Sequence, residues 1–224
     1  MVAKAIGEHG LEPLRGLGAY LGIGLLGLAL HVAGTYHLWL ALYVKMPLKT
    51  FWRQAKAPAI YSAGANSSLA TLPLTLKALE RLGVSKEASA LGACVGTNLN
   101  NDGIILYEAM AVLFVAQAHG IELSVFQQVM ASISCLIAAA GIAGVPEAGF
   151  ISLSLVLATV GLPLELLPLL LTVDWIIARA RSIVNVLSDM LVSIILDRWN
   201  GAAFAPAAAA AHCPAQTAQL KLES

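Results

Sequence analysis

A polar stripe inside a long apolar segment strongly constrains what this chain can fold into. Residues 172–199 (TVDWIIARARSIVNVLSDMLVSIILDRW) are long enough to span a bilayer as a helix, yet they contain Asp174, Arg181, Asn185 and Asp189. Spacings of seven, four and four put these four residues on one helical face. A charge at membrane depth costs roughly 2.5–3.5 kcal/mol even on lenient insertion scales. We therefore expect the stripe to face a polar cavity, a bound ion or a substrate, or to form structural ion pairs between packed helices.

The composition agrees with a membrane protein. The 224 residues are 58% hydrophobic and only 12% charged, and the mean hydropathy is +0.79, whereas soluble domains are about 25% charged. Because the net charge is zero, there is no basic surface that would suggest nucleic acid. The three cysteines lack metal-ligand spacing. These features predict an all-α, multi-pass integral protein of a cell or inner membrane.

The chain divides into five apolar blocks between two flanking segments. Residues 1–16 are expected to form the end of a preceding helix and an external loop, and residues 200–224 an Ala-rich cytoplasmic tail. The region between them, 17–199, is predicted to form one core that contains a spanning helix, a hairpin, a broken helix, a second hairpin and the polar-striped helix, at 17–44, 55–84, 88–119, 124–160 and 164–199.

Three of these blocks are interrupted by short runs rich in Gly, Ser, Asn and Pro, at 64–73, 96–103 and 140–149. Unpaired backbone groups in hydrocarbon cost several kcal/mol each, so irregular backbone is tolerated only around a protein-lined or water-filled cavity. One such break alone could be a kink. Three breaks together with a charged stripe favour a shared site near the bilayer midplane, and broken helices and re-entrant hairpins are typical of secondary transporters.

The distribution of basic residues predicts an orientation. Segments 45–56 and 77–86 carry seven Lys and Arg residues, whereas connectors 117–128 and 159–168 carry none. By the positive-inside bias, the first two segments are cytoplasmic and the connectors are external. The two hairpins are then expected to enter the membrane from opposite sides, with the C-terminus in the cytoplasm.

Four motifs carry a resemblance to a known family. They are SSLATLP at 67–73, NLNNDG followed by LYEA within 98–109, AGVPEAG at 143–149, and VDW…R…NV…D within 173–189. Their order and spacing resemble the dicarboxylate/amino acid:cation symporter family over nearly all of residues 1–199. The resemblance implies that residues 17–44 are the sixth transmembrane helix. The first five helices of the family, which supply a trimerisation scaffold, are then expected to be missing, so the partner is either a homotrimer or a separate scaffold polypeptide.

The resemblance also implies sites for a coupling ion, Na⁺ or H⁺. One sodium site would use oxygen atoms of Gly96, Asn100, Asn185 and Asp189. A second would use Asn100 and Asp102, with its other ligands on a missing helix. A third would use backbone carbonyls, at Asn98, Ala139, Ala140 and Ile142. Carboxylate, amide and carbonyl oxygens are the ligands that suit a hard cation such as Na⁺.

The implied substrate site centres on Arg181, whose planar guanidinium suits bidentate carboxylate binding. The other positions that match substrate contacts lie at the two hairpin tips, in the central break and on the last helix: Ser68, Val145, Asn101, Ala178, Ser182 and Asn185. Bound substrate and lipid are the implied partners.

Four positions depart from the family pattern. Ala178 stands where the family has the aspartate that binds a substrate ammonium group, and Ile104, Asn101 and Leu69 replace a threonine, a methionine and a serine. An ammonium group in a desolvated pocket without a counter-charge is strongly unfavourable. We therefore expect a substrate without that group, a dicarboxylate rather than an acidic amino acid.

Two other interpretations remain open. The chain could be a truncated, non-transporting fragment or a subunit that needs a separate scaffold. It could instead be an intramembrane aspartyl protease that uses Asp102 and Asp189, since two aspartates can share a proton, but neither lies in the glycine-flanked motif usual for that class. A serine nucleophile lacks a suitable base, because His31, His37 and His119 are interpreted as interfacial or packing residues. We expect no enzyme, and we expect Arg179 to pair with Asp174 or a lipid headgroup.

Overall fold

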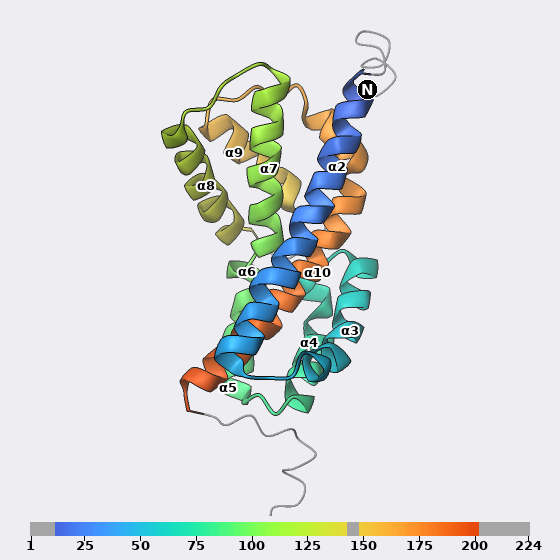
Figure 1. Cartoon of the computed structure of the whole chain (residues 1–224), viewed down its shortest axis with the longest axis vertical. Coiled ribbons are helices and arrows are strands. Elements are labelled where there is room, and N and C mark those ends of the chain that lie inside the picture. The colour runs from blue at the N-terminus through green and yellow to red at the C-terminus, as the bar shows by residue number, and fades with distance from the viewer. Residues whose placement is uncertain (1–11, 143–147, 202–224) are drawn as a thin grey trace, which may run out of the picture.

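A computed structural model describes residues 12–142 and 148–201, and every regular element within them is helical (Figure 1). The elements are, in chain order, α2 (Glu12–His31), η1 (Val32–Tyr36), η2 (Trp39–Val44), α3 (Leu48–Ala65), α4 (Ser68–Arg81), α5 (Lys86–Ser89), η3 (Ala90–Val95), α6 (Gly96–Leu99), α7 (Asp102–Ala118), α8 (Val125–Ala140), α9 (Ala148–Thr159) and α10 (Leu167–Trp199). Within this part of the chain, two helical stretches, Gly16–Val44 and Lys86–Ala118, are long and apolar enough to cross a bilayer.

Helix α10 is the central support of the fold. It runs beside α2 along the length of the molecule (Figure 1) and packs against α3, α4, α7 and η3 as well. The four residues of its polar stripe, Asp174, Arg181, Asn185 and Asp189, are each at most 4% exposed. The stripe therefore faces the protein interior, as its helical spacing predicted.

Two helical hairpins, α3–α4 and α8–α9, lie towards opposite ends of the molecule (Figure 1). In the first, α3 ends at Asn66, which adopts the left-handed conformation with a φ of 50°. The side chain of Ser67 then caps α4 by accepting a hydrogen bond from the backbone N–H of Ala70. The predicted tip residue of the second hairpin, Val145, lies outside the described residues.

The third block is broken where the sequence predicted an interruption. The helical path through η3 and α6 ends at Asn100, and α7 begins at Asp102 after a short non-helical link. The backbone N–H of Asn100 donates to the carbonyl of Gly96, which closes the last turn of α6. This break lies between the two hairpins along the molecule (Figure 1).

The first helix departs from the ordinary spanning helix expected over residues 17–44. From Val32 onwards it contains two π-helical segments, η1 and η2, and it ends at Lys45 in the left-handed conformation. A π-turn brings residues five apart onto the same face, and such turns are frequent at functional sites. Here the π-turn aligns His31 with Tyr36, whose rings meet edge to face with centroids 4.9 Å apart.

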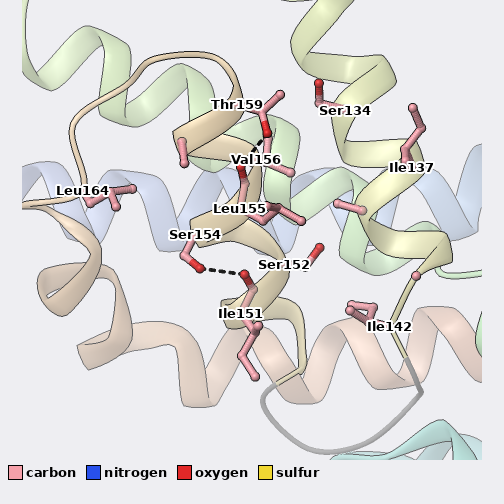
Figure 2. A pocket seen from close by; sticks show the side chains of 13 residues that line it. Ser134, Ile137, Ile142, Ile151, Ser152, Ser154, Leu155, Val156, Thr159 and Leu164 are labelled. Atoms are coloured by element: carbon pink, nitrogen blue, oxygen red, sulfur yellow. Dashed lines mark hydrogen bonds between the residues drawn. The ribbon is translucent and has the colours of Figure 1, made fainter.

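An open groove of about 690 Å³ lies between the arms of the second hairpin (Figure 2). Its walls are mostly apolar, and the hydroxyls of Ser154 and Thr159 donate to carbonyls of their own helix, at Ile151 and Leu155. Among the described residues that line it, this groove therefore offers no cationic group to a carboxylate.

Candidate ion- and carboxylate-binding site

The tip of the first hairpin meets both the central break and α10. The hydroxyl of Thr97 on α6 donates to Ser68 Oγ at 2.9 Å. The hydroxyl of Ser182 on α10 donates to Asn66 Oδ1 at 3.2 Å. Both serines are buried, so three segments that are distant in sequence converge through direct polar contacts. Two of the three predicted breaks, at 64–73 and 96–103, thus meet at α10.

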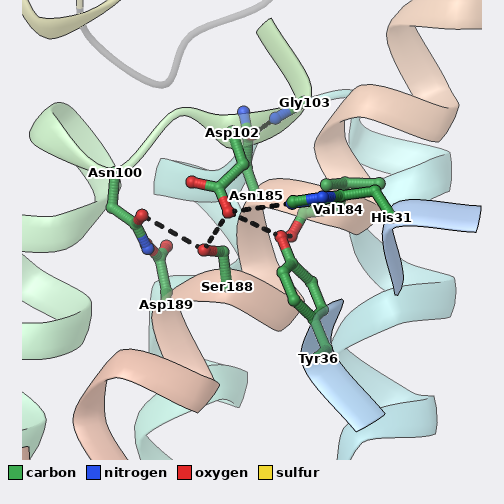
Figure 3. A network of polar contacts seen from close by, with 9 residues as sticks. All are labelled: His31, Tyr36, Asn100, Asp102, Gly103, Val184, Asn185, Ser188 and Asp189. Carbon is green, nitrogen blue, oxygen red and sulfur yellow. Dashed lines mark hydrogen bonds and ion pairs between the residues drawn. The ribbon is translucent and has the colours of Figure 1, made fainter. Parts of the chain in front are cut away.

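The carboxylate of Asp189 lies against the backbone of α6 and the amide of Asn100. A Cβ added to Gly96 would lie 3.0 Å from Asp189 Oδ1, so the absence of a side chain lets the carboxylate approach the backbone of α6. As drawn in Figure 3, the amide nitrogen of Asn100 lies 3.3 Å from the same carboxylate oxygen.

The amide of Asn100 is better satisfied when it is rotated by 180°. Its nitrogen then donates to Asp102 Oδ1 at 2.8 Å and to Ser188 Oγ at 3.1 Å, and its oxygen accepts from the backbone N–H of Asp189 at 3.3 Å. Rotation also places the amide oxygen, instead of the nitrogen, beside Asp189. Carboxylate and amide oxygens then lie together, and such oxygens suit Na⁺.

The other oxygen of Asp102 is held by a network that includes the first helix (Figure 3). Asp102 Oδ2 accepts hydrogen bonds from the hydroxyls of Tyr36 at 2.9 Å and Ser188 at 2.8 Å, and it lies 3.3 Å from His31 Nε2. The interpretation of His31 as an interfacial or packing residue was therefore wrong. The physical reason is the π-turn after His31, which an apolar helical pattern does not reveal.

Asn185 joins α10 to the start of α7. Its Oδ1 accepts a hydrogen bond from the backbone N–H of Gly103 at 2.8 Å, and its Nδ2 donates to Asn101 Oδ1 at 3.3 Å. A Cβ at Gly103 would come within 2.7 Å of the Arg181 carbonyl, so the two helices are in backbone contact here. The Asn185 amide is thus engaged in holding the break, and a role as a sodium ligand stays a prediction.

Arg181 is buried and only partly paired. Its Nη2 lies 3.2 Å from Asp174 Oδ1, and its guanidinium carbon lies 4.0 Å from the ring centroid of Tyr107. Its Nη1 is buried without a hydrogen-bond partner among the described residues. A Cβ added to Gly149 would lie 2.7 Å from that nitrogen, so the start of α9 covers it closely. The Nη1 edge of the guanidinium is therefore an unused donor in the described part of the chain, and an anion reaches it only when α9 moves away.

Arg179 is not the partner of Asp174. It is exposed, donates to the carbonyl of Trp175 and lies over the Trp175 ring at 5.4 Å. Asp174 instead pairs with Arg181, seven residues further along the same helix. Ala178, between them in sequence, is 4% exposed and contributes no charge to the site.

Glu108 and Tyr107 on α7 were not singled out from the sequence. Glu108 is fully buried, and its two carboxyl oxygens have no hydrogen-bond partner among the described residues. The available signal was the LYEA segment itself, which puts a glutamate inside an otherwise apolar run. A buried, unpaired carboxyl group is costly and therefore unusual.

Two hairpins and a broken helix meet at buried carboxylate, amide and guanidinium groups, an arrangement that is typical of secondary transporters. The chain belongs to the sodium:dicarboxylate symporter family, whose pattern it matches over residues 1–199. This confirms the family expected from the four motifs.

Curated relatives are similar over most of the chain. Excitatory amino acid transporter 3 of Mus musculus is 38% identical over 200 residues, which are 88% of this chain and 38% of the relative. Excitatory amino acid transporter of Caenorhabditis elegans is 36% identical over 204 residues, which are 90% of this chain and 41% of the relative. The chain thus spans about two fifths of the length of these relatives.

Proposed function

We propose that the chain forms the transport-domain core of a secondary active symporter that couples Na⁺ to the uptake of an anionic carboxylate. The proposal rests on two kinds of buried polar group that lie near the central break: oxygen atoms that suit a cation and a guanidinium that suits an anion. Oxygen atoms of Asp189 and, after rotation of its amide, of Asn100 suit a cation, and Gly96 lies beside them. The half-paired guanidinium of Arg181 suits a carboxylate.

The proposed substrate is a dicarboxylate in preference to an acidic amino acid. The relatives are named excitatory amino acid transporters, and this chain has Ala178 one turn before Arg181. The nearest acid on that face of α10, Asp174, is already paired with Arg181. An α-ammonium group bound beside Ala178 would therefore lack a counter-charge, and its desolvation would weaken binding.

In the proposed mechanism, the cation binds beside Asp189 and a substrate carboxylate binds the free edge of Arg181. The two hairpins enter the bilayer from opposite sides, and α8–α9 closes over the occupied site before the domain moves. The geometry supports closure at this place because Gly149, at the start of α9, already lies against Arg181. A carrier that closes only when loaded moves substrate and ion together.

Two alternatives are retained. Coupling to H⁺ is favoured by Glu108, a buried carboxyl group whose oxygens have no hydrogen-bond partner among the residues that the structure describes. The chain spans about two fifths of the length of its relatives. This length favours a fragment that transports only as a homotrimer or with a separate scaffold polypeptide.

The test is the thermal stability of the purified chain in detergent, with Na⁺ or choline and with succinate, malate, aspartate or glutamate. A ligand at a hundredfold its Kd stabilises the folded state by about 2.7 kcal/mol. We expect a sodium-dependent stabilisation by a dicarboxylate. The Arg181→Lys variant, which keeps the charge but loses the planar fork, should lose the carboxylate effect and keep the sodium effect.

Greater stabilisation by aspartate or glutamate than by succinate or malate would contradict the proposed substrate class. A folded chain that responds to no combination of ion and carboxylate would contradict a working site and would favour the non-transporting fragment.

A further inference from the structure

The side chain of Asn101 bridges three helices at the break. It is fully buried. Its Nδ2 donates to the backbone carbonyl of Asn98 at 3.1 Å and to that of Ala139, near the end of α8, at 2.9 Å. Its Oδ1 accepts from Nδ2 of Asn185 on α10 at 3.3 Å. Asn101 thus connects α6, the second hairpin and α10 through one amide group.

The orientation of this amide is fixed by its neighbours. Carbonyl oxygens only accept hydrogen bonds, and an amide nitrogen donates two. Rotating the Asn101 amide would place its oxygen against the two carbonyls of Asn98 and Ala139, with no donor between them. It would also place its nitrogen against the donor nitrogen of Asn185. Only the observed orientation satisfies all three partners.

Two backbone carbonyls from separate helices therefore converge on one positively polarised group. Buried carbonyls that point to a common centre require either hydrogen-bond donors or a cation. The carbonyls of Asn98 and Ala139 are two of those assigned by resemblance to a third sodium ion. In this chain the amide of Asn101 already satisfies them, so a cation does not fit there unless the Asn101 side chain moves away.

We propose that Asn101 takes the place of a coupling cation in this chain. Its NH₂ group supplies the positive charge density that holds the end of α8 against the break, so the second hairpin docks there without an ion. If the chain is the symporter proposed above, it couples one cation fewer than a relative with those carbonyls free. The docking itself rests only on the contacts of Asn101.

The test is hydrogen exchange of the last turn of α8 in the full chain in detergent, without substrate, in NaCl or in choline chloride. We expect the wild-type chain to protect these amides equally in both salts. Asn101→Leu keeps the approximate size but removes both donors. It should raise exchange in choline by about fivefold, given a net worth of about 1 kcal/mol for the hydrogen bond to Ala139. Asn101→Ala also vacates the space of the amide, so in that variant Na⁺ should restore protection by binding the freed carbonyls.

Asn101→Asp, which keeps the acceptor but lacks the donors, should show the same loss in choline. Leu99→Ala is the matched control, because Leu99 lies in the same break with its side chain 58% exposed, and it should leave exchange unchanged.

Protection of wild-type α8 that appears only in Na⁺ would overturn the proposal, and this measurement does not depend on the folding of any variant. Equal protection in Asn101→Leu and the wild type would overturn it as well. Since no substrate is present, failure of the proposed transport function would leave these results unaffected.

Discussion

At the scale of single residues, the proposed preference for a dicarboxylate rests on Ala178. It is buried and three residues before Arg181 on α10. We predict that Ala178→Asp supplies the missing counter-charge and improves the binding of aspartate relative to succinate by about tenfold or more, as expected for a charge-assisted contact. Ligand titrations of thermal stability measure this ratio. Ala178→Asn adds the same shape without the charge, and an equal gain in both variants would contradict the explanation.

Asp189 is the residue on which the proposed sodium site depends. Its carboxylate is 2% exposed and lies against Gly96 and Asn100. We predict that Asp189→Asn raises the sodium concentration needed for half-maximal stabilisation by about tenfold or more, because a full negative charge is lost from the ligand set.

The matched control for this prediction is Asp197→Asn. Asp197 is also a buried acid of α10, but it accepts a hydrogen bond from the backbone of Ser85 at the far end of the helix. The Asp197→Asn variant should leave the sodium response unchanged even if the overall stability of the chain falls. Unaltered sodium affinity in Asp189→Asn would remove Asp189 from the site.

At the scale of elements, the contact between η3 and α10 depends on Gly92. A Cβ at this position would lie 2.5 Å from the backbone nitrogen and Cα of Ser193. We predict that Gly92→Ala destabilises the chain by about 1–3 kcal/mol, because the helices must separate to admit the methyl group. Gly22→Ala is the control, since a Cβ there meets nothing within 4 Å and alanine favours a helix. Equal melting temperatures of the two variants would show that η3 and α10 do not pack this closely.

The ends of helices were predictable from the sequence where the residue types at those positions determine them. Gly and Asn disfavour regular helix, and the structure interrupts the helical path at Asn66 and at Asn100–Asn101. Pro73, at the end of the first predicted break, instead lies inside α4. The π-turn at Val32–Tyr36 was missed, because its sequence is as apolar as an ordinary helix. Its contacts with Asp102, through His31 and Tyr36, were missed with it.

At the scale of the whole molecule, the orientation of the two hairpins gives a direct prediction. In a background without cysteine, a cysteine at Lys49 should react with an impermeant maleimide only from the cytoplasmic side, and one at Glu122 only from outside. The physical reason is the concentration of Lys and Arg around α3 and their absence from the 117–128 connector. Labelling of sealed vesicles before and after permeabilisation measures this. Reaction of both positions from the same side would contradict the proposed topology.

The sequence alone determined that the chain is helical, that its helices are interrupted, that the last one carries a polar stripe, and that it belongs to this family. Each of these depends on residue type and spacing along a short segment. Only the tertiary structure decided which polar groups meet. The contact of His31 with Asp102 joins residues 71 apart, and that of Asn101 with Ala139 joins residues 38 apart. Such contacts depend on how whole helices pack, and a buried amide or carboxylate takes whichever partner the packing brings within hydrogen-bond distance.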